Sequence, residues 1–457
     1  MKKQRSILCI AVAFIFILPF LVSCSSSTEN AVAQQGVAWQ YKGVSMNEND
    51  PTLRHYVWEM ARPPYGRWDK IQLHRYVKET ANADCIPGKP AADPLKVLFF
   101  NPGTWDRAIH ATQDTATSQQ WYFAANGYDF YAIDFRTAFV TTMDYDQYAT
   151  YGYTSDLAGT ADWTYGLFRE DIKLCVDLAK QMSGASKVFM SGFSRGGTHM
   201  MAYAAKYWQT DLKGMISLDG GGLWRTVDNP ATQKSKAAFD TAVAAFKAGT
   251  LAAPYNIFLT DATGTERTRF GGMFPYSKNT VTRAPDNTTS SLQTDVAFLK
   301  GYFTSAGLNP TDIPAPPQTI SDVLAYTYYW GWGKGLLTNI YGGFSTIDVQ
   351  IKYQSILSRW WPNIQYLESS YLTGYANNPY LDYQNTTDVT LPFIFFGTER
   401  SCAGGSCLTP GPGGPMTKST DVTKIYLQGY GHVDTIIGSK SATDVKAVEL
   451  NWMNARL

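Results

Sequence analysis

The chain is poor in the residues that build metal sites and disulfide scaffolds. It has only 6 cysteines and 5 histidines in 457 residues. Two of the cysteines, Cys9 and Cys24, lie near the N-terminus, and no Cys or His pair in the remainder has the spacing of a zinc site. A disulfide-rich scaffold and a zinc domain are therefore not expected, and neither a metal nor another cofactor is predicted.

An excess of either charge is also missing. The 39 basic and 38 acidic side chains leave a net charge of +1, which becomes −2 if residues 1–23, with Lys2, Lys3 and Arg5, are removed. Such a balance gives no electrostatic basis for binding nucleic acid. Internal repeats are absent, and beyond the N-terminus no apolar run is long enough to span a bilayer.

The N-terminus has the organisation of an export signal. Basic residues within 1–5 precede an apolar stretch over 7–18, which is too short to span a bilayer comfortably. Residues 21–24, Leu-Val-Ser-Cys, resemble a bacterial lipobox, which implies cleavage of 1–23 and lipidation of Cys24. The alternatives are an ordinary signal peptide and a retained membrane anchor.

The lipobox leads to an expected location. We predict that residues 24–36, which are small and polar, form a flexible tether. The mature protein would then be lipid-anchored to a bacterial membrane, at the outer membrane or the cell surface.

The most informative stretch of the chain runs from residue 187 to residue 205. An apolar run typical of a buried strand leads into Gly192-Phe193-Ser194-Arg195-Gly196, and a helix-forming run of small residues follows. This strand–turn–helix context is the one in which a G-x-S-x-G motif presents a nucleophilic serine. We therefore predict Ser194 as a nucleophile, with an inert serine in a structural turn as the alternative.

Short apolar runs alternate with helical patterns, which favours an α/β fold with a mostly parallel sheet and helices on both faces. Helices are expected over 118–126 and 168–182, the latter carrying Cys175 as a buried free thiol. The first expected strand, 71–77, should be half-exposed. The others are expected at 96–101, at 129–134, in the apolar run that begins at residue 187, and at 213–219, 391–397 and 424–428.

The gap between the expected strands at 213–219 and 391–397 is too long for a loop. Residues 220–390 are therefore interpreted as a cap insertion that divides a core of 37–219 and 391–457. The insertion begins with a helical pattern to about residue 249, and its aromatic-rich part, 326–383, would form a small core or line an apolar cleft.

A nucleophilic serine needs a histidine base and an orienting acid. The candidates are His55, His74, His110, His199 and His432. The first two lie in or before the first expected strand, and His199 follows Ser194 on the same helix and should point away from it. His110 is a weaker candidate than His432, which follows the last expected strand. We predict His432 as the base.

The order of serine before histidine resembles that of the α/β-hydrolases, and the resemblance extends from about residue 65 to the end of the chain. Residues 96–103 resemble the strand and oxyanion loop of lipases, with Asn101-Pro102 before Gly103. Residues 126–134 resemble the next strand, and 431–438 resemble the Gly-His-x-Asp ending of lipase-like members. Phe193 stands where the commonest elbow has His.

The resemblance implies the positions of the remaining site residues. The acid usually follows the strand at 391–397, where Glu399 is the only carboxylate of the turn and is our first choice. Asp219, after the preceding strand, is the alternative acid, and another carboxylate is not excluded. Asp434 is expected to be structural. Backbone N–H groups of Arg195 and Thr104, with Trp105 as the rival of Thr104, would form the oxyanion hole.

Together, the motifs and the family resemblance predict an exported serine hydrolase that cleaves carboxylic esters, like a lipase or esterase, through an acyl-enzyme. An amidase, peptidase or acyltransferase on the same residues is the nearest alternative, and a non-catalytic surface binding protein is the alternative from another class. Cys402 and Cys407 flank Ala-Gly-Gly-Ser, which is flexible enough for a small disulfide.

Overall fold

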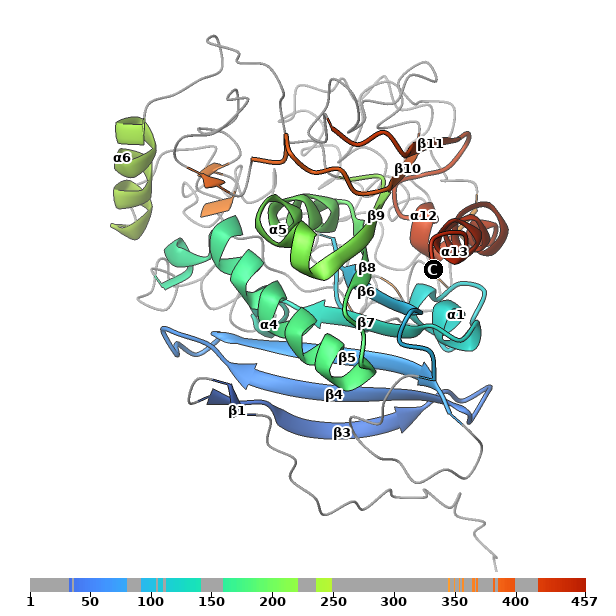
Figure 1. Cartoon of the computed structure of the whole chain (residues 1–457). Helices are drawn as coiled ribbons and strands as arrows, with labels where there is room; N and C mark the ends of the chain where they lie inside the picture. The colour runs from blue at the N-terminus through green and yellow to red at the C-terminus, as the bar shows by residue number, and fades with distance from the viewer. Residues whose placement is uncertain are drawn as a thin grey trace, which may run out of the picture.

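One nine-stranded sheet forms the centre of the protein (Figure 1). The computed structural model describes residues 33–34, 37–79, 92–103, 106–109, 112–140, 159–220, 236–248, 344–345, 349, 353, 356, 364–365, 367–368, 381–382, 385–398 and 418–457. The strands are β3 (Gln40–Met46), β4 (Leu53–Ala61), β5 (Lys70–Lys78), β6 (Val97–Asn101), β7 (Asp129–Asp134), β8 (Val188–Phe193), β9 (Leu212–Leu218), β10 (Phe393–Thr398) and β11 (Val422–Leu427).

The order across the sheet is β11-β10-β9-β8-β6-β7-β5-β4-β3. The strands from β11 to β7 are parallel, so their carboxyl ends meet at one edge. The pairs β7–β5, β5–β4 and β4–β3 are antiparallel. This confirms the predicted α/β fold with a mostly parallel sheet.

The N-terminal side of the sheet differs from the prediction. β3 and β4 precede the strand that was expected to be first, and β5 is buried over most of its length rather than half-exposed. A neighbour on each side and helix α1 (Gln119–Ala125) over one face account for this burial. The two-residue strands β1 (Ala33–Gln34) and β2 (Val37–Ala38) also pair, so the end of the predicted tether carries secondary structure.

Helices cover both faces of the sheet. Helices α4 (Tyr165–Ser183) and α5 (Arg195–Asp211) lie in front of it in Figure 1, whereas α1 and α13 (Ala447–Asn454) lie to the right. Alternate strand residues supply the two cores, because successive side chains of a strand point to opposite faces. Phe99 and Met190 belong to the core under α4 and α5, and Leu98 and Phe189 to the core under α1 and α13.

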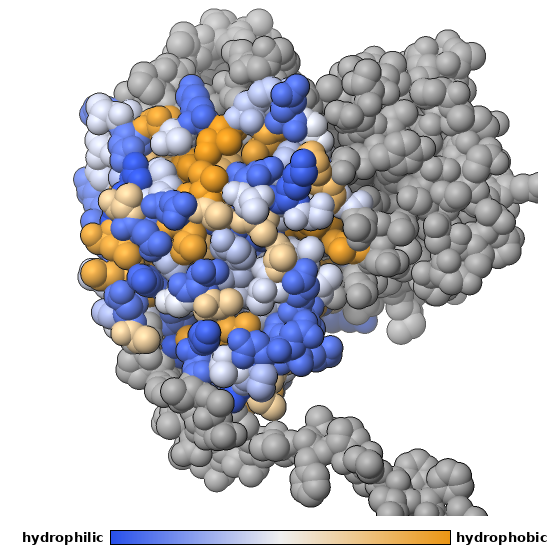
Figure 2. Space-filling view, turned by 90° about the vertical axis from the view of Figure 1, so that its right-hand side faces the viewer, coloured by the Kyte–Doolittle hydropathy of each residue, from blue (hydrophilic) through white to orange (hydrophobic). Residues whose placement is uncertain are grey.

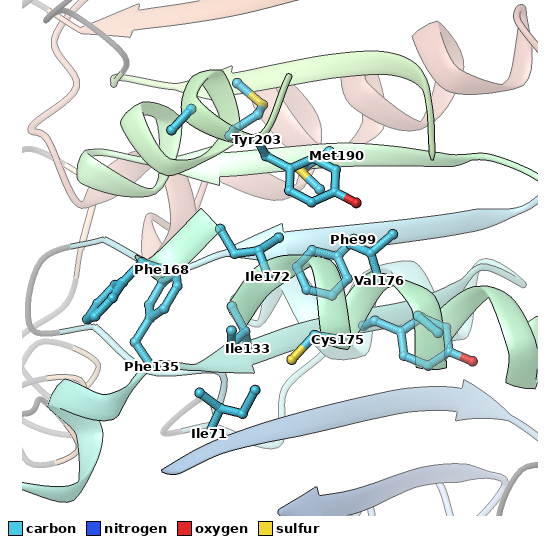
Figure 3. Close-up of a cluster of buried hydrophobic side chains, with 14 of the residues drawn as sticks. Ile71, Phe99, Ile133, Phe135, Phe168, Ile172, Cys175, Val176, Met190 and Tyr203 are labelled. Carbon is cyan, nitrogen blue, oxygen red and sulfur yellow. The ribbon is translucent and has the colours of Figure 1, made fainter. Parts of the chain in front are cut away.

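The first of these cores is built from strand and helix side chains that meet between the layers. Figure 3 shows Phe99, Ile133 and Met190 of the sheet facing Ile172, Cys175 and Val176 of α4 and Tyr203 of α5. Cys175 is fully buried and free, as predicted, and burial raises the pKa of its thiol well above the ordinary value.

Local sequence signals set the helix ends. Ser118 caps α1 by accepting from the Trp121 N–H at 3.3 Å, and Thr164 caps α4 by accepting from the Leu167 N–H at 3.0 Å. Gly184 ends α4 in a left-handed conformation with φ 76°. Both predicted helices are therefore confirmed.

The described part of the insertion contains α6 (Lys236–Lys247), in agreement with the helical pattern. Two later residues of the insertion, Ile364 and Leu367, join the core under α4 and α5, and Tyr353 joins the opposite core.

Within the described part of the chain, no helix combines the length and apolarity needed to cross a membrane. On the face that carries α1 and α13, hydrophilic and hydrophobic residues are interspersed (Figure 2).

Candidate active site

Ser194 lies on a sharp turn between β8 and α5, with φ 55° and ψ −121°. Such angles are strained for a residue with a side chain. The flanking glycines make the turn possible, since a Cβ on Gly192 would lie 2.3 Å from the Gly196 oxygen and one on Gly196 would lie 2.0 Å from the Asn101 oxygen. The Ser194 N–H donates to the Leu218 oxygen at 2.9 Å. The backbone is thus fixed in the nucleophile-elbow form.

Asp219 and His432 form a buried pair beside this turn. Nδ1 of His432 lies 2.5 Å from Oδ2 of Asp219, which directly follows β9. Thr398, at the end of β10, donates to the same carboxylate through its N–H at 2.9 Å and its hydroxyl at 2.8 Å. Asp219 itself has a positive φ of 50°. This arrangement fixes the carboxylate and orients the imidazole ring of His432.

The pair and the turn are in direct contact. β8 and β9 are neighbours in the sheet, so their carboxyl ends meet at one edge. A Cβ on Gly220 would lie only 2.0 Å from the Ser194 oxygen, and the Phe193 ring lies 4.7 Å from the His432 ring between centroids. The structure therefore brings Ser194, His432 and Asp219 together.

The structure favours the alternative acid over the first choice. Asp219 occupies the place of an acid behind His432, whereas Glu399 lies outside the described residues. A signal for Asp219 was present in the sequence, because it ends an apolar strand and is followed by three glycines. Asp434 has the structural role expected, since it begins α12 (Asp434–Ile437) and accepts from the Gly431 N–H at 2.8 Å.

The loop after β6 lies against the elbow. A Cβ on Gly103 would be 3.2 Å from Cβ of Ser194 and 2.9 Å from Cδ1 of Phe193. The two residues proposed for one oxyanion donor, Thr104 and Trp105, lie outside the described residues. The other predicted donor, the N–H of Arg195, lies at the start of α5, directly after Ser194.

The side chain of Arg195 is engaged elsewhere, which the sequence did not indicate. Its Nε donates to the Tyr165 hydroxyl at 2.9 Å, and the guanidinium carbon lies 5.3 Å from the ring centroid. Burial lowers the pKa of Arg195, while Tyr165 and Glu368 oppose this shift. Glu368, from the insertion, accepts from the Tyr165 N–H at 2.8 Å. The insertion is thereby connected to the nucleophile helix.

Three other described histidines lie in different surroundings, and two of them, His55 and His74, are neighbours, with His55 Nε2 2.9 Å from His74 Nδ1. His199 is buried among Phe135, Tyr165 and Phe168, and burial holds its pKa well below 6.5, so it is a neutral core residue. His74 has an acidic neighbour, because its Nε2 lies 3.4 Å from Oδ2 of Asp134. His110 lies outside the described residues.

Several other predictions also fall outside the described residues. They concern Cys24 and the export signal, and the Cys402–Cys407 disulfide. Among the residues that the structure describes, no group of His, Cys, Asp and Glu side chains has the arrangement of a metal site.

Solved structures with the same fold resemble this one. A protein from Sulfolobus solfataricus assigned as a lipase aligns with TM-score 0.60 and 22% identity, covering 92% of this chain and 99% of that chain. An α/β hydrolase fold protein from Nakamurella multipartita (TM-score 0.36, 9% identity, 85% and 97% covered) and an esterase from Rhodococcus (0.38, 11%, 88% and 99%) are more distant. The similarity to the first structure shows the fold.

No curated protein matches the sequence. The family described as the alpha/beta hydrolase fold matches residues 118–388, which is more than half of the 457 residues. The matched region includes Ser194 and Asp219 and ends before His432. The chain belongs to the α/β hydrolase fold family.

Proposed function

We propose that this protein is a serine hydrolase that cleaves carboxylic esters with Ser194, His432 and Asp219. The observation that carries the proposal is the 2.5 Å contact of His432 Nδ1 with Asp219, next to a serine held at φ 55° on the elbow. A serine, a histidine and a buried carboxylate in this relation are the parts of a nucleophilic triad.

Each residue has a distinct role in the proposed reaction. Ser194 Oγ attacks the acyl carbon while His432 Nε2 takes its proton. The same imidazole then protonates the leaving alcohol, and water releases the acyl group from Ser194 in a second cycle. Asp219, fixed by Thr398, holds Nδ1–H and stabilises the imidazolium that forms in each step.

Backbone donors would stabilise the developing oxyanion. We assign them to the N–H groups of Arg195 and Thr104. The position of Gly103 against Ser194 supports the second assignment, because it brings the start of this loop to the elbow. The lipase assignment of the Sulfolobus protein supports an ester as the substrate.

We further propose that the protein is exported and anchored through a lipid on Cys24 after removal of residues 1–23. The support is the n-region, apolar stretch and lipobox of the sequence. Cys24→Ser should release the protein from membranes with unchanged specific activity, since the lipid only anchors. Membrane association of this variant in a fractionation experiment would contradict the proposal.

The reaction class can be tested on the full-length protein in detergent. A fluorophosphonate probe should label Ser194, identified by peptide mass spectrometry, and p-nitrophenyl esters should be hydrolysed. Matched p-nitroanilides should react far more slowly. Faster anilide cleavage would indicate an amidase or peptidase, and absence of labelling would indicate a non-catalytic protein.

A further inference from the structure

A second buried carboxylate lies at the same edge of the sheet as the candidate active site. Asp134 is the last residue of β7 and is fully buried. Its Oδ1 accepts from the Ala108 N–H at 2.6 Å. Its Oδ2 accepts from Arg107 Nε at 3.0 Å and Nη2 at 2.5 Å, with His74 Nε2 3.4 Å away. Both main partners belong to the loop that follows β6.

That loop is the one that touches the nucleophile. It leaves β6 at Gly103, where a Cβ would lie 3.2 Å from Cβ of Ser194, and Asp106 donates its N–H to the Gly103 oxygen at 3.2 Å. Five residues after Gly103, Ala108 is fully buried and accepts from Tyr76 Oη at 3.2 Å. Asp134 therefore fixes the far end of a short loop whose near end lies against Ser194.

The carboxylate is held in its ionised form. Burial alone would raise the pKa of Asp134, but the Arg107 guanidinium and then His74 bring it well below the ordinary value. An ionised acceptor makes stronger hydrogen bonds than a neutral one. The loop is thus anchored by charge-assisted bonds rather than by packing alone.

We propose that Asp134 is a positioning residue for the reaction: with Arg107 it holds the loop after β6 in the place where that loop meets the nucleophile elbow. This inference rests on the proposed function. Because the donors of an oxyanion hole act on the transition state, a displaced loop lowers kcat and leaves substrate binding almost unchanged. A displacement of about 1 Å costs roughly 10²-fold in rate.

The same strand offers a matched control. Asp129 begins β7, is also buried, and is also held by an arginine, since Arg75 Nε and Nη2 donate to it at 2.7 and 2.8 Å. It lies at the opposite end of the strand, away from Ser194. Asp129→Asn and Asp134→Asn therefore remove equivalent charges, and they differ in which edge of the sheet is affected.

The experiment measures kcat, KM and the thermal midpoint with p-nitrophenyl butyrate, using the full-length protein in detergent. Asp134→Asn should lower kcat about 10²-fold with KM within about threefold. Asp129→Asn should lower the midpoint at least as much and leave kcat within about threefold. If Asp134→Asn is folded and keeps its kcat, or if both variants lose kcat equally, the proposal is wrong.

Arg107 supplies a second, milder variant in case Asp134→Asn does not fold. Its side chain is a quarter exposed. When it is removed, Asp134 keeps the hydrogen bond from the Ala108 N–H and its neighbour His74. Arg107→Ala should lower kcat about tenfold, and Arg107→Lys should recover most of it because the charge returns. Equal kcat in both variants and the parent protein would overturn the proposal. If Ser194→Ala is still active, the proposed function fails instead, whatever the Asp134 result.

Discussion

The two edges of the parallel sheet differ in where the chain is strained. At the amino edge, the turns from helix to strand use Gly127 and Gly184, with φ 81° and 76°, where glycine pays no steric penalty. At the carboxyl edge, two of the turns out of strands place Ser194 and Asp219 at φ 55° and 50°. A positive φ at a residue with a side chain costs about 1–3 kcal/mol. Two of the three described residues that combine a side chain with a positive φ thus lie at the candidate active site, and the third, Tyr65, lies between β4 and β5.

The edges also differ in how they treat buried carboxyl groups. Asp129, at the amino edge, is paired with the Arg75 guanidinium through two short hydrogen bonds. Asp106 and Asp434, at the carboxyl edge, have no such pairing among their described interactions, and burial raises the pKa of each to about 7. The carboxyl edge, where Asp134 is likewise paired with an arginine, therefore has in addition buried carboxyl groups whose charge changes near neutral pH.

The largest expected effect concerns the strained serine itself. Ser194→Ala should reduce ester turnover on the order of 10⁶-fold, since the nucleophile is lost, while the fold persists. The measurement is kcat/KM with p-nitrophenyl butyrate, with circular dichroism as the control for folding. Residual turnover above about one per cent would show that this edge does not carry the chemistry through Ser194.

The second test compares the two candidate acids. Asp219→Asn should lower kcat about 10⁴-fold, because the amide disfavours the histidine tautomer that the reaction needs. Glu399→Gln should change kcat less than threefold. If the two variants rank in the opposite order, the acid belongs to the turn after β10, as the sequence first suggested.

The third test uses the pH dependence of stability. Folded Asp106 keeps its proton up to about pH 7, whereas the unfolded chain releases it near pH 4. Its contribution is therefore present at low pH and is lost as the pH rises through this window. Asp106→Asn, which cannot titrate, should gain up to about 4 kcal/mol relative to the parent between pH 4 and pH 8.

Denaturant unfolding at several pH values measures this change. Parallel curves for Asp106→Asn and the parent would contradict the prediction.

The smallest effect tests the backbone comparison directly. Ser194→Gly should raise the free energy of unfolding by about 1 kcal/mol, because glycine relieves the positive φ. Gly184→Ala should lower it by about 1 kcal/mol, because the new Cβ meets a φ of 76°. If Ser194→Gly is no more stable than Ser194→Ala in urea unfolding, the turn stores no such strain.

Local patterns predicted much of the fold. The helix that begins after Ser118, the helix end at Gly184 and the buried strands carry their signals within a few residues, whereas the cap at Thr164 makes α4 begin three residues before the predicted start at 168. β3 and β4 were not predicted from the sequence, because polar residues interrupt their apolar runs. Arg54 is buried against Glu79, and a bulge between Tyr41 and Gly43 shifts the register of β3. Such strands are identified by their partners rather than by their own sequence.

The choice of the acid also depends on contacts that a local sequence pattern does not contain. Asp219 and Glu399 both follow strands that end at the same edge, so position along the chain does not separate them. Contacts from distant parts of the chain support Asp219, since Thr398 donates to it twice and His432 reaches it across 213 residues, while Glu399 lies outside the described residues. Ser194 was apparent because the elbow carries its whole signal in five consecutive residues.

The insertion between β9 and β10 has a consequence for how the molecule could be divided. Ser194 and Asp219 precede it and His432 follows it, while the register that pairs Met215 with Phe393 joins its two ends. A chain nicked inside 220–390 would yield two fragments, neither of which holds all three residues of the proposed triad. Recovery of the proposed ester cleavage on mixing the fragments would therefore report that β10 has docked beside β9.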